Sequence, residues 1–518
     1  MTHSFAPNIV VRMAEPGLLV ATIDMPGRSM NVFSDALMDA LEALMDHVDR
    51  APEVHAVVLT SAKPTFLAGA DLAMVRGFTT SARTLAEPAL FALCGRLGQL
   101  FVRLEASAKP YVAAVNGLAL GGGLELAMAC RERIVVDDPK VQLGLPEVRW
   151  GLLPGAGGTQ RLPRLAGIDA GLSMLLTGRS VAPAEALTLG IVAEVVPRDR
   201  LLARAGEIAL SLRGLPYDPQ HKYRHLEQRN VPARTDDEVR RLARRHDVGE
   251  AQFRDYPAHR MIIDCVLLGA RQPLAKATAT EMTQFLRLMI DPVAGHMIRS
   301  LFLNRQAADK ALAAPRELMI EDIVHAPFTA GMRVWADALV RSHIPVREDA
   351  SLPPGRMLLT DNRGQSHLVQ AASLTSAATS PPPPLAVLTA PGPYGRVLEI
   401  VGAGQGTAEA LAALAPRLGG ALPYRSGGRT SVLRQLNSSV TREPDDLARM
   451  ALRLLDEGTA PRADFLDVAA CVSGVAPAFT GGPLSWLWDH RERLAPGLDE
   501  PLRAALARQL PALQAACD

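Results

Sequence analysis

Through the first 212 residues, short apolar runs rich in β-branched residues alternate with longer segments whose apolar residues have helical spacing. The runs that predict strands are Ile9–Val11, Leu18–Ile23, Ala56–Thr60 and Val112–Val115. The segments that predict helices are Ser34–Val48, Leu93–Leu104 and Leu201–Leu212. Strands that alternate with helices are typical of an α/β domain. The pattern ends near Gly214, so we expect this domain to cover residues 1–214.

The rest of the chain divides by composition. Residues 215–313 begin with many Arg, Lys and His residues and continue with strong helical patterns, which predicts a basic and helical linker region. The basic part is either a patch for an anionic ligand or partner, or a solvated connection, and its mixed charges favour the connection. Residues 314–384 end in four prolines, which cannot form a helix or a central strand, so we expect an irregular Pro/Ser/Ala-rich connector. Residues 385–518 begin with a strand-like VLEIV run and predict a mainly helical region.

The overall composition is that of a globular protein. Of the 518 residues, 48% are hydrophobic and 21% are charged, which supplies ample material for buried cores. The net charge of +1 gives no electrostatic footprint for nucleic acid. The five cysteines lie far apart, without the spacing of a disulfide framework or a zinc site. The sequence contains no signal peptide and no apolar stretch of about 18 residues, so we expect a cytoplasmic protein without a membrane span.

A segment of small residues stands at 66–72 (FLAGADL). Small side chains at Ala68, Gly69 and Ala70 let a ligand come close to the backbone and leave the Ala70 N–H free to donate a hydrogen bond. Taken alone, such a run more often marks a tight turn.

A second segment, 114–125, leads from a strand through Gly121–Gly123 into a helix that carries Glu125. Glycines at the start of a helix present free N–H groups and the positive end of the helix dipole to an anion. The GxxxxGKS/T pattern of nucleotide-binding P-loops is absent, which excludes that phosphate site. The alternative anion is a thioester oxygen that gains charge during reaction. The amides of Ala70 and Gly122 are two donors that would stabilise it.

The third segment, 142–161, places Glu147 before a turn rich in glycine and proline that leads into another helix. A lone Glu at such a position usually caps a helix or pairs with a cation. Its combination with the two preceding segments favours a catalytic role.

Together the three segments resemble the crotonase (enoyl-CoA hydratase/isomerase) superfamily in their order and spacing. The resemblance rests on the strings AGAD, NGLALGGGLEL and LGLPEVRWGLLPGAGGTQRLPRL and covers roughly residues 8–212. It implies the crotonase (ClpP-like) α/β fold, a spiral superhelix of β-β-α units, and an oxyanion hole formed by Ala70 and Gly122. It also implies that Glu125 and Glu147 are the catalytic carboxylates. The residues that it implies as contacts of the substrate's coenzyme A are Ala68, Ala70, Asp71, Leu72 and Gly122.

Hydration of a trans-2-enoyl-CoA requires both carboxylates. One has to orient and deprotonate water at C3, and the other has to protonate C2, a division that different environments impose on two acids. We expect Glu125 to activate the water and Glu147 to supply the proton. Superfamily members that only shift a double bond often keep one of these acids, so the sequence favours an enoyl-CoA hydratase, with Δ3–Δ2 isomerisation as the alternative. Coenzyme A enters as part of the substrate, and no metal, NAD or other cofactor is expected.

The second half of the chain resembles another part of a known enzyme. Residues 253–313 are similar to the linker of the multifunctional α-subunit of the fatty-acid oxidation complex, in which a 3-hydroxyacyl-CoA dehydrogenase follows. No GxGxxG fingerprint occurs over 314–384, and the run Gly402–Gly406 continues with Thr407 where the last glycine would stand. A lone GxG motif is weak evidence for a dinucleotide site.

The run VLEIV matches a later strand of that dehydrogenase, which carries the Glu of a His–Glu dyad. Glu399 would be that Glu, but the positions of the dyad His and of a nearby Asn hold Val387 and Ala390. Without the His base, hydride transfer has no acid–base partner. Residues 463–487 are similar to the helical C-terminal domain of the same family, so 385–518 predicts a degenerate, inactive dehydrogenase remnant.

Two other functions stay open at this point. One is a bifunctional hydratase and dehydrogenase that binds NAD through Gly402–Gly406. The other is a non-catalytic scaffold for a thiolase. Besides the acyl-CoA substrate, the expected partners are a thiolase or further copies of the chain.

Overall fold

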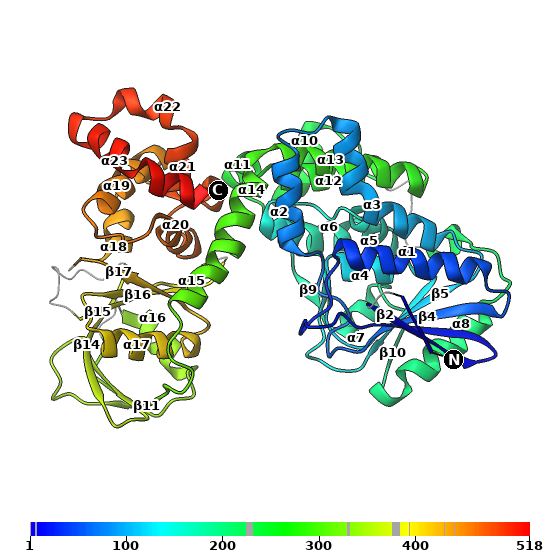
Figure 1. Cartoon of the computed structure of the whole chain (residues 1–518), viewed down its shortest axis with the longest axis horizontal. Coiled ribbons are helices and arrows are strands. Elements are labelled where there is room, and N and C mark those ends of the chain that lie inside the picture. Colours follow the sequence, from blue (N-terminus) through cyan, green and yellow to red (C-terminus); the bar gives the residue numbers. More distant parts are fainter. Residues whose placement is uncertain are drawn as a thin grey trace. The chain divides into compact units, whose positions relative to one another are not determined.

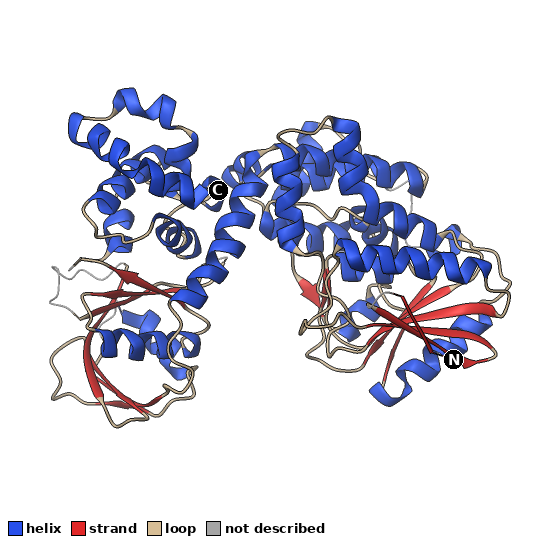
Figure 2. Ribbon diagram, in the orientation of Figure 1, coloured by secondary structure: helices blue, strands red, loops and turns tan. Residues whose placement is uncertain are grey.

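The computed structural model describes residues 2–5, 8–223, 231–328, 332–374, 384–392, 394–428, 430–439 and 441–517. The internal contacts divide the chain into two units, Met1–Ala294 and Gly295–Asp518. Figure 1 labels their elements and Figure 2 separates helices from strands. None of the described helices is long and apolar enough to cross a membrane.

The first unit contains a seven-stranded sheet in the order β1-β2-β3-β4-β5-β7-β10. Its strands are β1 (Thr2–Phe5), β2 (Ile9–Glu15), β3 (Gly17–Ile23), β4 (Val54–Ser61), β5 (Tyr111–Val115), β7 (Glu132–Val136) and β10 (Glu194–Val196). The first three pair antiparallel, and β3 to β10 pair parallel. Strands β4 and β5 are apolar and buried almost throughout, because helices pack on both faces of a parallel sheet. A second sheet contains β6 (Ala119–Leu120), β8 (Leu143–Gly144) and β9 (Ser180–Val181).

The helices of the first unit follow the expected apolar spacing. They are α1 (Asp35–Arg50), α2 (Leu72–Ser81), α3 (Glu87–Glu105), α4 (Gly122–Ala129), α5 (Gly158–Ala166), α6 (Ile168–Thr177), α7 (Pro183–Thr188), α8 (Leu201–Ser211), α9 (Pro219–Lys222), α10 (Asp236–Arg245), α11 (Glu250–Asp255), α12 (Pro257–Gly269) and α13 (Leu274–Ile290). Helix α1 begins where Ser34 caps it by accepting a hydrogen bond from the Leu37 N–H. Its buried Leu37, Leu41, Leu44 and Val48 recur at helical spacing on one face. Figure 1 shows α8 below the sheet, opposite α1 and α4.

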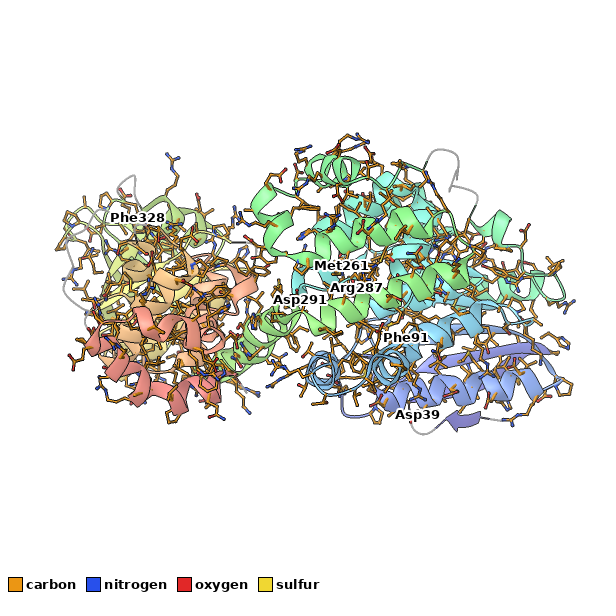
Figure 3. The ribbon with its side chains drawn as sticks, turned by 90° about the horizontal axis from the view of Figure 1, so that it is seen from above. Asp39, Phe91, Met261, Arg287, Asp291 and Phe328 are labelled. Atoms are coloured by element: carbon orange, nitrogen blue, oxygen red, sulfur yellow. The ribbon has the colours of Figure 1, made fainter. Side chains whose placement is uncertain are left out.

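Helices α12 and α13 belong to the first unit. Helix α12 contacts α5 and α6, and α13 contacts α3 and α5. Figure 3 shows α13, which carries Arg287, beside the helix that carries Phe91. The segment expected as a linker therefore covers the α/β domain up to the boundary at Ala294.

The second unit is built on a mixed seven-stranded sheet in the order β12-β11-β13-β14-β15-β16-β17. Its strands are β11 (Ile320–His325), β12 (Val346–Glu348), β13 (Arg356–Asp361), β14 (Ser366–Ser373), β15 (Leu385–Leu388), β16 (Val397–Val401) and β17 (Leu422–Ser426). Its helices are α15 (Arg305–Ala311), α16 (Arg333–Val340), α17 (Gln405–Leu414), α18 (Val432–Asn437), α19 (Pro444–Asp456), α20 (Ala463–Val472), α21 (Pro483–Asp489), α22 (Arg491–Leu494) and α23 (Glu500–Cys517). Helix α14 (Pro292–Ile298) spans the boundary between the units and continues into a π-helical turn, Arg299–Asn304.

Two expectations for the second half were wrong. Residues 314–384 are not an irregular connector where the structure describes them, since they supply α16 and four strands of the sheet. The C-terminal region is mixed α/β rather than mainly α, because β15, β16 and β17 complete that sheet, although helices predominate after β17. Strands β13 and β14 pair antiparallel with each other, and β11 and β15 pair with them on either side. Of the four prolines, those at 381–383 lie outside the described residues.

Candidate active site

The glycine run places Glu125 inside the first unit. Chain from β5 passes through the short strand β6 and turns at Gly121, whose φ of 52° is a left-handed conformation that glycine adopts without strain. Helix α4 then begins at Gly122, and every residue of it is buried, including Glu125 at 2% exposure. The expected strand, glycine turn and helix are thus confirmed.

The two expected oxyanion donors lie on neighbouring segments. Ala70 forms a bridge with Phe33, and a Cβ built on Gly69 would lie 3.4 Å from the Leu120 carbonyl oxygen. Segment 69–70 therefore runs against the turn that ends at Gly122. Within the described part of the chain, neither the Ala70 amide nor the Gly122 amide donates a hydrogen bond. Both N–H groups are free for a ligand.

The carboxylate of Glu125 is held by the loop before α5. Its Oε1 accepts hydrogen bonds from the amides of Ala156 at 2.8 Å and Gly158 at 2.7 Å. A Cβ on Gly158 would lie 2.8 Å from the same oxygen, so only glycine lets the backbone come this close. Burial raises the pKa of Glu125 to about 6, although the two amides and the Arg161 charge act to lower it.

Glu147 begins a 3-10 turn, Glu147–Trp150, and faces the glycine turn of α4. A Cβ on Gly121 would lie 2.8 Å from Glu147 Oε1, which places this carboxylate beside the start of α4. The residue as a whole is half-buried, but its Oε2 is enclosed and has no hydrogen-bond partner among the described residues. Burial, and then the charge of Glu125, raise the pKa of Glu147 well above the ordinary range of a carboxyl group. The structure thus brings together two carboxyl groups of unequal acidity.

The other expected contacts of coenzyme A lie on the same stretch of chain. The Ala68 amide donates to the Asn31 carbonyl at 2.9 Å, and Asp71 forms an ion pair with Arg28 at 2.9 Å. Leu72 begins α2. The Ala68 amide and the Asp71 carboxylate are therefore engaged by protein groups.

A third buried carboxylate was not predicted. Glu281 of α13 is 1% exposed and accepts hydrogen bonds from the amides of Gly157 at 2.6 Å and Thr159 at 2.8 Å, and from the Thr159 hydroxyl. Burial and the charge of Glu125 raise the pKa of Glu281 to about 8. One signal was available in the sequence, because Glu281 occupies the apolar face of its helix together with the buried Phe285 and Leu288.

A buried ionic cluster supports α5 from the side of α3. Glu105 accepts from Arg161 Nε at 2.9 Å and from the Tyr217 hydroxyl at 2.7 Å, and it also contacts Lys222 and the Tyr223 hydroxyl. Burial acts to raise the pKa of Glu105, but Arg161 and Lys222 outweigh it and lower the pKa to about 2. Arg161 is therefore held in place one turn after the amides that bind Glu125.

In the second unit, β15 and β16 pair antiparallel and place Val387 directly opposite Glu399. Glu399 is fully buried and accepts hydrogen bonds from the Ser426 and Ser431 hydroxyls and from the amides of Val432 and Leu433. Gly402 and Gly404 connect β16 to α17. Among the described residues, no group of three or more His, Cys, Asp and Glu side chains is arranged to hold a metal ion.

Comparison with known proteins identifies relatives of the first unit. The model of the enoyl-CoA hydratase/isomerase family matches residues 15–253. A fatty acid oxidation complex subunit alpha from Shewanella frigidimarina is 37% identical over 305 residues, which cover 58% of this chain and 41% of that protein. The corresponding subunit from Idiomarina loihiensis is 47% identical over 204 residues, covering 39% of this chain and 28% of that protein. The chain thus spans about two fifths or less of the length of these two relatives.

Solved structures of the family give a weaker comparison. An enoyl-CoA hydratase from Bacillus anthracis is 27% identical and covers 54% of this chain and 89% of its own, with a TM-score of 0.35. A TM-score at this level supports no conclusion about the fold.

Proposed function

We propose that the protein is an enoyl-CoA hydratase, since residues 15–253 match the model of the enoyl-CoA hydratase/isomerase (crotonase) family. It adds water across the double bond of a trans-2-enoyl-CoA to give a 3-hydroxyacyl-CoA. The observation that carries the proposal is the inequality of two neighbouring carboxyl groups. Glu125 is bound by two amides, whereas Glu147 Oε2 has no hydrogen-bond partner among the described residues.

This inequality assigns the proton transfers. Glu125, with the lower pKa, is ionised near neutral pH and takes a proton from the water that attacks C3. Glu147, with the higher pKa, is protonated and gives its proton to C2. After one turnover Glu125 holds the proton and Glu147 is ionised, and exchange with solvent restores the starting state.

The oxygen of the thioester gains negative charge when water adds at C3. The free amides of Ala70 and Gly122 lie on adjacent segments and supply two donors for that charge. Removing one such donor typically costs about 10²–10³-fold in kcat. Backbone donors cost no reorganisation during reaction, since the glycine turn and the Phe33–Ala70 bridge already fix them.

We place the acyl chain in a cavity of about 290 Å³ between α3 and α13. Phe91 and Gly95 line it from α3, Met282 lines it from α13, and Gly155 and Gly157 close it. The last two belong to the loop that holds Glu125, and Glu281, which binds the same loop, also lines the cavity. A Cβ on Gly95 would lie 3.6 Å from Met282 Cγ. Gly95→Leu should therefore narrow the cavity and lower activity toward long acyl chains more than toward short ones.

For the second unit we propose an inactive dehydrogenase remnant. Val387 lies opposite Glu399, where the related dehydrogenases would place the His of the dyad, and a valine cannot accept the alcohol proton. The carboxylate of Glu399 instead holds the start of α18 through Ser431, Val432 and Leu433 and the end of β17 through Ser426. A thiolase or a second copy of the chain is the proposed partner, and light scattering of the protein alone and with a thiolase measures either assembly.

The test uses the purified full chain and a panel of trans-2-enoyl-CoA thioesters of different length. Hydration removes the absorbance of the conjugated thioester, and Glu147→Gln should abolish it, whereas Glu87→Gln, an exposed carboxylate on α3, should leave it unchanged. A protein that converts 3-enoyl-CoA but hydrates no 2-enoyl-CoA would be an isomerase. If NADH formed when NAD was added to the hydration assay, the proposal that the second unit has no dehydrogenase activity would be wrong.

A further inference from the structure

Four consecutive backbone N–H groups, those of residues 156–159, are shared alternately between two buried carboxylates. The amides of Ala156 and Gly158 donate to Glu125. The amides of Gly157 and Thr159 donate to Glu281. The loop therefore lies between the two side chains. Glu125 holds one face of the loop and Glu281 holds the opposite face.

The start of α5 requires an acceptor from elsewhere in the chain. Its N-cap is Gly157, which has no side chain to accept hydrogen bonds from the first turn. Gly157 has a φ of 100°, and a Cβ there would lie 1.8 Å from Arg161 Nη1, so a local Ser or Asp cap does not fit. Glu281 of α13 supplies the acceptor.

Helical capping alone does not require a carboxylate at this place. The charge of Glu125 acts against ionisation of Glu281, and a third acid buried near Glu125 and Glu147 is costly. A neutral acceptor would satisfy the same amides without that repulsion. The carboxylate of Glu281 binds the loop through both of its oxygens, which fixes the loop rigidly. Oε1 accepts from the Gly157 amide, and Oε2 accepts from the amide and the hydroxyl of Thr159.

We propose that Glu281 is a positioning residue of the hydration reaction: by binding the second and fourth amides of the loop, it aims the first and third at Glu125. This inference rests on the proposed hydratase function. Glu281 lies beyond residue 253, where the family match ends, so the first unit completes its active site with a residue from outside the matched domain. Without the hydrogen bonds from the loop to Glu281, the loop and the Glu125 carboxylate shift together, and the water is no longer aligned for attack on C3.

The test compares Glu281→Leu and Glu281→Gln with Gln284→Met, a control on the same helix whose side chain bonds, among the described residues, to Arg287 alone. We expect kcat with a trans-2-enoyl-CoA to fall about 100-fold in Glu281→Leu, since misplacement by about 1 Å has that effect. Because Glu281 also lines the cavity assigned to the acyl chain, the readout for positioning is kcat at saturating substrate, separate from any change in KM. Glu281→Gln keeps one acceptor oxygen, so its kcat should lie between that of the Leu variant and that of the wild type.

Hydrogen exchange measured by mass spectrometry provides a second readout. Peptides containing residues 156–159 should exchange faster in Glu281→Leu than in the control. If Glu281→Leu does not fold, Thr159→Val removes the hydroxyl bond to Glu281, together with the bond that this hydroxyl accepts from Gln160, and should lower kcat in the same direction. Unchanged kcat in the folded variants of an active enzyme overturns the inference alone. A wild type that hydrates no enoyl-CoA overturns the proposed function and this inference together.

Discussion

Replacing Glu125 with glutamine should inactivate the enzyme and stabilise the protein. Glutamine has the same shape and keeps an oxygen for the amides of Ala156 and Gly158, but it cannot take a proton from water. Loss of a general base costs about 10²–10⁴-fold in rate. At about 1.36 kcal/mol per tenfold, this is about 2.7–5.4 kcal/mol of transition-state stabilisation.

The stability effect follows from the raised pKa. Folding raises the pKa of Glu125 from 4.5 to about 6, so the folded state binds the proton more tightly than the unfolded state. The contribution of Glu125 to stability is therefore greatest below pH 4.5 and decreases as the pH rises through 6. The shift of about 1.5 units corresponds to about 2 kcal/mol. Glu125→Gln carries no such cost, so its free energy of unfolding should exceed that of the wild type by about 2 kcal/mol at pH 8.

Two measurements check this prediction. Hydration kinetics give the loss of kcat, and urea unfolding at several pH values gives the stability difference, which should shrink as the pH falls from 6 toward 4.5. A variant that is inactive but less stable than the wild type at pH 8 would refute the reasoning, because Glu125 would then be a structural ion. Retained hydration would refute its role as the base.

Four further predictions follow from the same contacts. The kcat/KM for hydration should decrease at pH values below about 6, because Glu125 becomes protonated there, and a pH–rate profile measures this. Glu105→Gln leaves its buried cations unpaired and should lower the free energy of unfolding by about 3–5 kcal/mol in urea titrations, the reverse of Glu125→Gln. Gly121→Ala puts a Cβ 2.8 Å from Glu147 Oε1 and should lower kcat about 100-fold in the same assay. Glu399→Leu leaves two amides without an acceptor, at about 1–3 kcal/mol each, and should make the second unit more sensitive to limited proteolysis while hydration kinetics stay unchanged.

Local sequence was sufficient for most of the first unit. The expected helix from Ser34 is α1 with Ser34 as its cap, and the expected strand Ala56–Thr60 lies within β4, because capping and apolar runs are local signals. The segments that carry Glu125 and Glu147 could be recognised in the sequence. Where the backbone lies close to a carboxylate only glycine fits, and these glycines form a specific sequence pattern. Here each glycine turn touches a carboxylate oxygen of the other segment.

The missed features depend on residues far apart in the chain. Glu281 lies more than 120 positions from the amides that it binds, and its own helix shows only an acid on an apolar face. Strand β14 reaches its parallel partner β15 across a proline-rich stretch of the sequence. The spacing of apolar residues within a segment does not show which distant strand it pairs with. The prediction of a connector for 314–384 therefore rested on composition alone.

The roles of the three buried acids follow from the donors around each of them. Three carboxyl groups near one another in a dry site cannot all be ionised, so the group with the best-compensated charge loses its proton first. Glu125 has two amides and the charge of Arg161, and its pKa rises only to about 6. Glu281 has three donors but meets the charge of Glu125, and its pKa rises to about 8. For Glu147 only its own backbone amide opposes burial and the charges of both other acids, so its pKa lies well above the ordinary range of a carboxyl group. In the proposed hydration reaction the same loop would make Glu125 the base and leave Glu147 as the acid, and removing a loop donor should raise the pH at which hydration begins.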